Sequence, residues 1–278
     1  MIRILAYAKI NLSLNVLRRR EDGFHEIDSL IQTIGLADEI TVRQTDASLT
    51  VTNDLELPPQ EDLAWRAARL VLDRKDVRFG MQLSVRKRIP TGAGLGGGSS
   101  DAAAVLWAVD RLTPPVLPHK HLFDLAAQLG SDVPLFLHGG LLRATGRGES
   151  ITPIFPCCRE IFVLIVPPVH SDTTSVYREM QTLIVPDRRS ARQPHLGEND
   201  LYSAAVFLYP ELTPYGHAIG KLGAEYAGMS GSGSTFFAAF KDERTATTAR
   251  LNMEKTFPQA RVYLVQATST GFLAKGEA

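Results

Sequence analysis

The 278-residue sequence contains only two cysteines, the adjacent pair Cys157 and Cys158. Neighbouring cysteines have poor geometry for an intrachain disulfide, and this pair lacks the C-x-x-C spacing of zinc and redox sites. The sequence also has no H-E-x-x-H motif, so we do not expect a metal site built by the protein alone. Scarce cysteine is typical of a reducing compartment, and a cytoplasmic protein is therefore predicted.

An excess of charge of either sign is also missing, because 30 Lys and Arg residues balance 30 Asp and Glu residues. Such a chain has no general attraction for nucleic acid or for an anionic membrane surface. The longest apolar run, Ile161–Val169, contains two prolines. It is about half as long as the roughly 20 residues that a membrane-spanning helix needs. We expect no nucleic-acid or membrane partner, and any bound anion must be held locally.

The order of the predicted elements indicates an α+β protein with two lobes and a cleft between them. Apolar and polar residues alternate from Ile10 to Val16, which predicts a half-buried strand with Lys9 and Asn11 on its polar face. Asp22-Gly23 predicts a turn. The patterns further predict strands over residues 31–51, 79–85, 161–166, 235–240 and 261–265, and helices over 62–71, 99–112, 122–129, 200–208 and 242–257.

The strongest local signal is a glycine-rich stretch directly before a predicted helix. Glycine lets backbone N–H groups approach a ligand and adopt positive φ. The N–H groups at a helix start favour an anion such as phosphate. A tight turn capped by a serine needs one glycine, so phosphate binding is the preferred interpretation. The stretch reads Pro90-Thr91-Gly92-Ala93-Gly94-Leu95-Gly96-Gly97-Gly98-Ser99-Ser100.

Two common phosphate loops fit this stretch poorly. Gly92, Gly94 and Gly97 match the dinucleotide fingerprint of dehydrogenases, but Pro90 separates the loop from the preceding strand. The acidic residue that should end the next strand is replaced by Asp110, which falls inside the predicted helix. A Walker A loop is excluded because no Lys-Ser or Lys-Thr pair follows.

The stretch from Pro90 to Ser100 resembles the ATP-binding loop of the GHMP small-molecule kinases. The resemblance implies a two-lobed GHMP kinase fold that uses ATP and Mg²⁺. Residues 1–155 would form an N-terminal ATP-binding lobe similar to domain 2 of ribosomal protein S5, and residues 156–278 a C-terminal α/β sandwich lobe. Further stretches resemble the family in the expected order along nearly the whole chain: Ala8–Leu12, Asp22–Glu26, Leu129–Pro134, Asn199–Leu201 and Met229–Gly233.

Lys9 and Asp132 are the candidate catalytic residues. From the residues alone, Lys9 could be a solvated lysine, and Asp132 could be a helix-start carboxylate beside a Ser131 cap. The resemblance implies instead that Asp132 takes the proton of the acceptor hydroxyl and that Lys9 lies beside it and stabilises charge. Pro90 to Ser100 would hold the phosphates of ATP with Mg²⁺, although the sequence does not indicate which residues ligate the metal.

The acceptor is suggested by the triple glycine Gly96–Gly98 followed by Ser-Ser-Asp. This version resembles the family members that phosphorylate the 2-hydroxyl of a cytidine-diphosphate-linked sugar alcohol in isoprenoid biosynthesis. The resemblance implies that aromatic rings stack on the cytosine, that a histidine reads its polar edge, and that polar residues position the acceptor and its diphosphate. The implied residues are Phe24 and Tyr177 for stacking, His25 for the base edge, and Asn11 and Thr173 for the acceptor.

The sequence departs from the commoner family pattern at two positions. Phe24 stands where Tyr is frequent, and Asp62 stands where Asn is frequent near the adenine. The loop Ser230–Ser234 resembles a second glycine loop that closes on substrate phosphates. A GHMP kinase with another acceptor, and a nucleotide-binding regulator without catalysis, are the alternatives. We expect a monomer or a weak homodimer.

Overall fold

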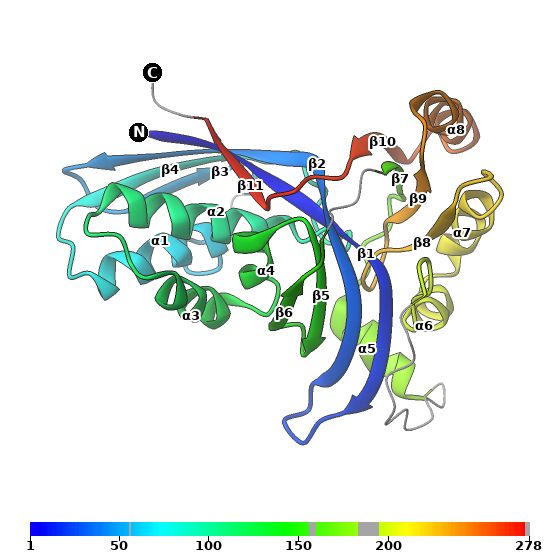
Figure 1. Cartoon of the computed structure of the whole chain (residues 1–278), viewed down its shortest axis with the longest axis horizontal. Helices are drawn as coiled ribbons and strands as arrows, with labels where there is room; N and C mark the ends of the chain where they lie inside the picture. Colours follow the sequence, from blue (N-terminus) through cyan, green and yellow to red (C-terminus); the bar gives the residue numbers. More distant parts are fainter. Residues whose placement is uncertain (56, 156–159, 183–194, 276–278) are drawn as a thin grey trace.

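Two β-sheets with helices packed against them make up the fold (Figure 1). The computed structural model describes residues 1–55, 57–155, 160–182 and 195–275. The α+β class predicted from the sequence is confirmed. The cysteine pair and the start of the expected second lobe, residues 156–159, lie outside the described residues.

The first sheet is built on a long antiparallel hairpin of β1 and β2, paired from Ile2 opposite Val42 to Arg19 opposite His25. The hairpin turns at Asp22-Gly23 as predicted, and Gly23 has a φ of 84° there. The order is β11-β1-β2-β4-β3, with β5 paired to β2 and β6 to β5. The strands are β1 (Ile2–Arg19), β2 (His25–Thr45), β3 (Thr50–Asn53), β4 (Gly80–Arg86), β5 (Leu141–Gly146), β6 (Ser150–Pro153) and β11 (Phe272–Lys275).

The strand predicted over residues 31–51 differs in its bounds, because β2 begins earlier and ends at Thr45. Residues 46–49 then cross the end of β4, so that β3 pairs with β4 in the parallel direction. Gly80 makes this crossing possible, since a Cβ atom there would lie 1.7 Å from the carbonyl oxygen of Ala47. The hydrophobic periodicity of the sequence does not indicate such a crossing.

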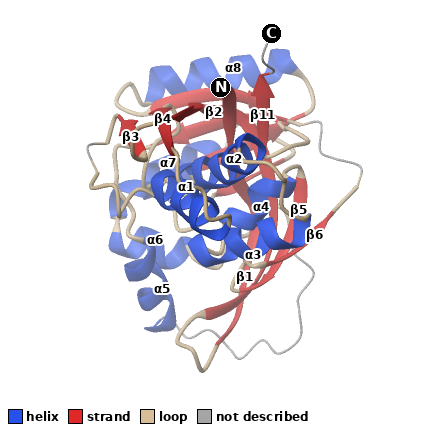
Figure 2. Ribbon diagram, turned by 90° about the vertical axis from the view of Figure 1, so that its left-hand side faces the viewer, coloured by secondary structure: helices blue, strands red, loops and turns tan. Residues whose placement is uncertain are grey.

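Four helices gather on one face of the first sheet (Figure 2). The second of them, α2, is buried around most of its circumference, as predicted from its Ala-rich sequence. The first, α1, is capped by Asp62, whose carboxylate accepts hydrogen bonds from the backbone N–H groups of Ala64 and Trp65. The helices are α1 (Leu63–Arg74), α2 (Gly97–Leu112), α3 (His119–Leu129) and α4 (Val133–His138).

The second sheet is antiparallel with the order β10-β7-β9-β8. Its strands are β7 (Ile161–Val166), β8 (Tyr226–Met229), β9 (Phe236–Phe240) and β10 (Arg261–Gln266). Its helices are α5 (Thr173–Thr182), α6 (Tyr202–Leu208), α7 (Thr213–Ile219) and α8 (Glu243–Thr256), with a 3-10 turn at Pro210–Leu212. None of the helices in the described part of the chain is long and apolar enough to cross a bilayer.

Strand β1 connects the two sheets and positions the site. Ala8, Ile10 and Leu12 share a core cluster with residues of the second sheet. The strand was predicted to be half-buried, with Lys9 and Asn11 on its polar face, but both residues are only 5% exposed. Two loops cover this face, because the backbone N–H of Lys9 donates to Leu95 and that of Asn11 to the Ser230 hydroxyl.

The end of the chain returns to its beginning. Strand β11 pairs with β1 from Arg3 opposite Lys275 to Ala6 opposite Phe272. In Figure 1 the two termini lie close together at one end of the first sheet. Residues that follow position 156 therefore contribute a strand to the first sheet.

Candidate active site

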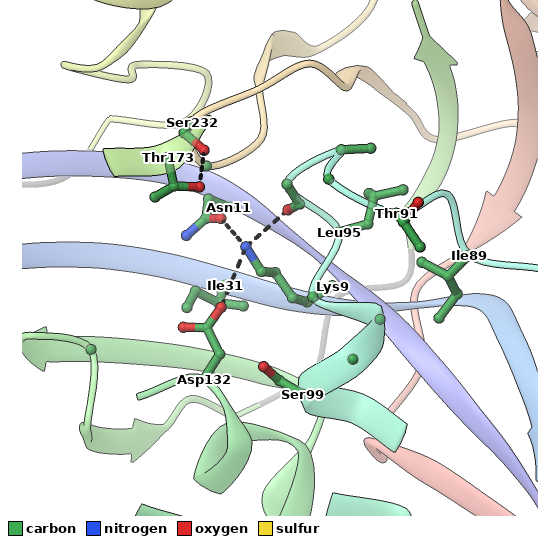
Figure 3. A pocket seen from close by; sticks show the side chains of 18 of the residues that line it. Lys9, Asn11, Ile31, Ile89, Thr91, Leu95, Ser99, Asp132, Thr173 and Ser232 are labelled. Carbon is green, nitrogen blue, oxygen red and sulfur yellow. Dashed lines mark hydrogen bonds and ion pairs between the residues drawn. The ribbon is translucent and has the colours of Figure 1, made fainter. Parts of the chain in front are cut away.

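A cavity of about 510 Å³ lies where β1, the glycine loop, the start of α4, the start of α5 and the second glycine loop meet (Figure 3). Lys9 and Asn11 reach it from β1, and Asp132 reaches it from the start of α4. Every residue of the loop from Pro90 to Ser99 lines it. The candidate catalytic residues and nearly all of the candidate ATP loop are thus brought together.

The glycine loop presents the start of α2 to the cavity. Its N-cap is Gly96, with φ of 71°, and the helix begins at Gly97, two residues earlier than predicted. No side chain caps this end, so the alternative of a serine N-cap is wrong. The N–H groups of the first turn consequently remain available to an anion, and the helix dipole favours one there.

The glycines also let two loops approach each other. Gly92 and Gly94 have φ of 63° and 74°. A Cβ atom on Gly94 would lie 2.3 Å from the carbonyl oxygen of Ser230, so this position needs glycine for packing as well as for backbone conformation. Between the glycines, Ala93 and Leu95 are buried in the core and anchor the loop.

The two serines after the glycines differ in their surroundings. Ser99 lines the cavity. Ser100 is fully buried, and its hydroxyl donates to the carbonyl oxygen of Tyr7 over 2.6 Å. Ser100 is absent from the described cavity lining, and its hydroxyl bond joins α2 to β1, so its contact with ATP stays a prediction.

Lys9 is held by three oxygen atoms. Its Nζ donates to Asn11 Oδ1 over 2.6 Å and to the carbonyl oxygen of Gly94 over 2.9 Å, and lies 3.9 Å from Asp132 Oδ2. Burial lowers the pKa of Lys9, and the charge of Asp132 opposes part of that decrease. Because an ammonium group has three N–H donors, one of them remains directed toward the carboxylate and the cavity.

Asp132 occupies the N-cap position of α4 without capping it through its side chain. It precedes α4 with a helical φ of −85°, and its side chain makes no cap hydrogen bond. The side chain is 41% exposed, so the carboxylate can meet a ligand in the cavity. Asp132 thus stands at the helix start, as the sequence alone suggested, but its side chain does not cap the helix.

Both polar atoms of the Asn11 side-chain amide make hydrogen bonds. Its Oδ1 accepts from Lys9, and its Nδ2 donates to the Ser29 hydroxyl over 2.8 Å. Ser29 in turn donates to the carbonyl oxygen of Ser13. This chain of bonds within the β1–β2 hairpin fixes where the ammonium group of Lys9 lies.

The second glycine loop, residues 230–234, closes the other side of the cavity. Its Ser232 hydroxyl is 2.8 Å from the Thr173 hydroxyl, a contact drawn in Figure 3. Asn199 holds the same loop by donating to the carbonyl oxygens of Met229 and Gly231. Gly231 and Ser232 line the cavity beside Thr173.

A second cavity of about 410 Å³ contains all three residues expected to bind a base: Phe24, His25 and Tyr177. The His25 ring stacks on the Tyr177 ring with centroids 5.1 Å apart. Phe24 is 53% exposed, and its ring faces the guanidinium of Arg147 at 4.9 Å. Burial raises the pKa of the Tyr177 phenol, and so does the charge of Asp132. The two cavities share the lining residues Ile27, Arg147, Thr173 and Tyr177.

Among the lining residues that the sequence interpretation missed are Lys87, Arg147 and Gln181. Arg147 stands between two glycines, a sign of a tight turn that could have drawn attention to it. Lys87 precedes the glycine loop and is bound to two buried carboxylates, those of Asp38 and Asp101. Nothing in the local sequence indicates that these partners meet.

The family is decided by two matching segments. Residues 62–140 match the model described as GHMP kinases N terminal domain, and residues 188–259 match GHMP kinases C terminal. The chain belongs to the GHMP kinase family. Leu63 of this GHMP kinase lines the larger cavity, whereas Asp62, the position that departs from the commoner pattern, caps α1.

Relatives of this GHMP kinase cover nearly all of its length. It is 38% identical to the 4-diphosphocytidyl-2-C-methyl-D-erythritol kinase of Pelotomaculum thermopropionicum, over 94% of this chain and 97% of that protein. A crystal structure of 4-(cytidine 5'-diphospho)-2C-methyl-D-erythritol kinase is 35% identical, with a TM-score of 0.81 over 95% of this chain and 98% of that one. A homoserine kinase from Cytophaga hutchinsonii is 19% identical with a TM-score of 0.75, covering 99% and 97%, and shares the fold.

Proposed function

We propose that this GHMP kinase transfers the γ-phosphoryl group of ATP to the 2-hydroxyl of 4-diphosphocytidyl-2-C-methyl-D-erythritol, a step of the non-mevalonate route to isopentenyl diphosphate. The observation that carries the proposal is the junction of the two cavities. Lys9 and Asp132 meet under the glycine loop, and Thr173 and Tyr177 line both this cavity and the one that contains the aromatic residues.

In this proposal each group of the larger cavity has one task. The start of α2 and the glycine loop hold the β- and γ-phosphates. The carboxylate of Asp132 orients the acceptor hydroxyl and takes its proton, and the ammonium group of Lys9 stabilises the charge on the transferred phosphoryl group. Asn11 keeps Lys9 in place, and Thr173 with Ser232 contacts the acceptor side.

ATP is used as its magnesium complex. Mg²⁺ is often bound through one or two carboxylates together with substrate phosphates and water. Among the described lining residues, Asp132 is the one carboxylate, and Ser99 adds a hydroxyl at the helix start. This donor set suits a Mg²⁺ ion held largely by the nucleotide. When bound, the ion neutralises charge on the phosphate oxygens.

The second cavity supports a cytidyl acceptor over the smaller acceptors of other GHMP kinases. Two aromatic rings, those of Phe24 and Tyr177, can stack on a base, and the imidazole of His25 can bond its polar edge. Three arginines line the same cavity. Arg147 lines both cavities, where its charge suits a diphosphate that joins the base to the reacting hydroxyl. A kinase for a small acid or amino alcohol has no use for this second cavity.

The experiment that tests the proposal is ³¹P NMR of the purified protein with Mg-ATP and the cytidyl acceptor. We expect ADP and a new phosphomonoester resonance, both dependent on the acceptor. ATP binding without transfer to this acceptor would contradict the proposed substrate, and a panel of mevalonate, homoserine and sugar acceptors would then identify another kinase. Absence of transfer to every acceptor would favour the nucleotide-binding regulator. The cytoplasmic location, the monomer or weak homodimer, and the absence of nucleic-acid and membrane partners stay predictions.

A further inference from the structure

Gln181 touches the base-reading histidine of the second cavity. His25 is the first residue of β2, and its ring stacks on Tyr177 of α5. Gln181 follows Tyr177 by four positions, so both side chains lie on the same face of α5. The Nε2 atom of Gln181 is 3.2 Å from Nε2 of His25. This contact joins α5 to the β1–β2 hairpin at the mouth of the cavity.

The contact determines which nitrogen of His25 carries the ring proton. With the amide oriented so that its NH₂ group faces the ring, Gln181 donates and Nε2 of the imidazole accepts. Burial lowers the pKa of His25, and the positive charge of Arg19 lowers it further, so the ring is neutral near pH 7. A neutral ring that accepts at Nε2 carries its proton on Nδ1, and no described residue bonds to Nδ1. An N–H donor is therefore left for a ligand.

The surroundings of His25 do not oppose this tautomer. The charged residues that line the cavity with it are Arg19 of β1, Arg147 of the turn after β5, and Arg178 of α5. No acidic residue is among the described lining residues, and Glu26, the next residue of β2, pairs with Arg18. The phenol of Tyr177 has a raised pKa and stays neutral. Gln181 is thus the group that sets the tautomer.

We propose that Gln181 is a positioning residue that selects cytosine over uracil by fixing His25 in the Nδ1–H tautomer. The selection rests on the proposed function, since it concerns the base of the cytidyl acceptor. Cytosine offers an acceptor at N3, which an imidazole N–H can satisfy. Uracil carries a proton on N3, and two facing donors would leave buried polar groups unpaired.

The tautomer itself is measured without substrate, by ¹⁵N NMR of the histidine ring in the full-length protein. We expect the Nδ1–H form for His25 in the wild-type protein and loss of that preference in Gln181→Met, which keeps the side-chain length but cannot donate. Gln128→Met is the matched control, because Gln128 is an exposed glutamine on α3 whose amide bonds only its own helix. An Nε2–H ring in the wild type, or an unchanged ring in Gln181→Met, overturns the proposal.

The specificity is measured as the ratio of kcat/KM for the cytidyl acceptor to that for its uridyl analogue. We expect Gln181→Met to lower this ratio roughly ten-fold, the effect of one hydrogen bond of ordinary strength. We expect Gln128→Met to leave the ratio unchanged. An unchanged ratio in Gln181→Met overturns the role of Gln181. If neither acceptor is phosphorylated by the wild type, the proposed function fails, and the ring spectrum still decides the tautomer.

The pH dependence of substrate selection in Gln181→Glu distinguishes a positioning role of Gln181 from a merely structural one. A carboxylate can only accept, so it draws the proton of a neutral His25 to Nε2 and turns the Nδ1 lone pair toward the ligand. Protonated His25 still donates at Nδ1. We therefore expect the cytidyl-to-uridyl ratio of Gln181→Glu to fall as the pH rises through the pKa of His25, while the wild-type ratio stays flat. A flat ratio in Gln181→Glu contradicts the proposal.

Discussion

The Nζ atom of Lys9 lies 3.9 Å from Oδ2 of Asp132, with the lysine side chain 6% exposed and the aspartate side chain 41% exposed. This separation is too long for a direct hydrogen bond, which leaves room for an acceptor oxygen to approach both groups. The cation is fixed by the protein through Asn11 and Gly94, whereas the carboxylate is open to the cavity. The arrangement suits a base that must reach a substrate proton beside a charge that must stay still.

Replacing Asp132 by asparagine is expected to reduce kcat by roughly 10²- to 10⁴-fold, the usual contribution of a general base. The side chain keeps its shape, so binding of ATP measured by calorimetry should change little. Asp124→Asn on α3 is the matched control, since Asp124 is exposed and is not among the described lining residues of the cavity. Near-normal turnover in Asp132→Asn would remove the assignment of the base.

Lys9 is expected to limit activity at high pH. Burial lowers the pKa of its ammonium group, so the positive charge is lost at a lower pH than for an ordinary lysine. We expect kcat to fall on the alkaline side, below pH 10.5, as Lys9 loses its proton. Lys9→Arg should move the alkaline decrease in kcat to higher pH, because arginine stays charged. A pH–rate profile that is the same for both proteins would contradict the role of this charge.

Asp101 is expected to make stability depend on pH. Burial raises the pKa of its carboxyl to about 8, although Lys87 opposes the increase. Because this pKa lies above the unfolded value of 3.8, the contribution of Asp101 is present at low pH and is lost as the pH rises toward 8. The slope for one proton is at most about 1.4 kcal/mol per pH unit. Chemical denaturation should show a shallower decrease for Asp101→Asn than for the wild type, and equal slopes would contradict this assignment.

The two serines after the glycine loop are expected to respond differently to alanine substitution. Ser100→Ala removes the buried bond to the carbonyl of Tyr7 and should lower the free energy of unfolding by about 1–2 kcal/mol, with little change in ATP affinity. Ser99→Ala should weaken ATP binding and leave stability nearly unchanged, because Ser99 lines the cavity. Urea denaturation and calorimetric ATP titration measure the two effects. The reverse result would restore Ser100 as a ligand residue.

Much of the fold could be predicted from local patterns. The helices α1, α2, α3 and α8 follow from apolar spacing and from caps such as Asp62 and Asp242. Short elements were missed: α4 is a six-residue helix, and β11 is a four-residue strand stabilised by pairing with β1. Pairing partners this far apart in sequence leave no local periodicity.

The candidate site likewise contains residues that local sequence indicates and residues that only tertiary packing brings there. Residues in distinctive motifs, such as Lys9, Asp132 and the glycine loop, could be proposed from the sequence and lie together in one cavity. The approach of Arg147 and Gln181 to His25 could not be predicted, because it depends on how the turn after β5 and the last turn of α5 pack against the hairpin. Ser100 belongs to the same motif but is fully buried, which the motif alone does not indicate.

The β1–β2 hairpin acts as a spacer of fixed length between two recognition points. His25 stands at one end of β2, and Ile31, which pairs with Asn11, lies six residues along the same strand. At about 3.3 Å per residue this span is roughly 20 Å. An acceptor must therefore be long enough to place its base and its reacting hydroxyl at both points together. Selection by the hairpin is then a selection for molecular length, which acts in addition to the chemistry at either end.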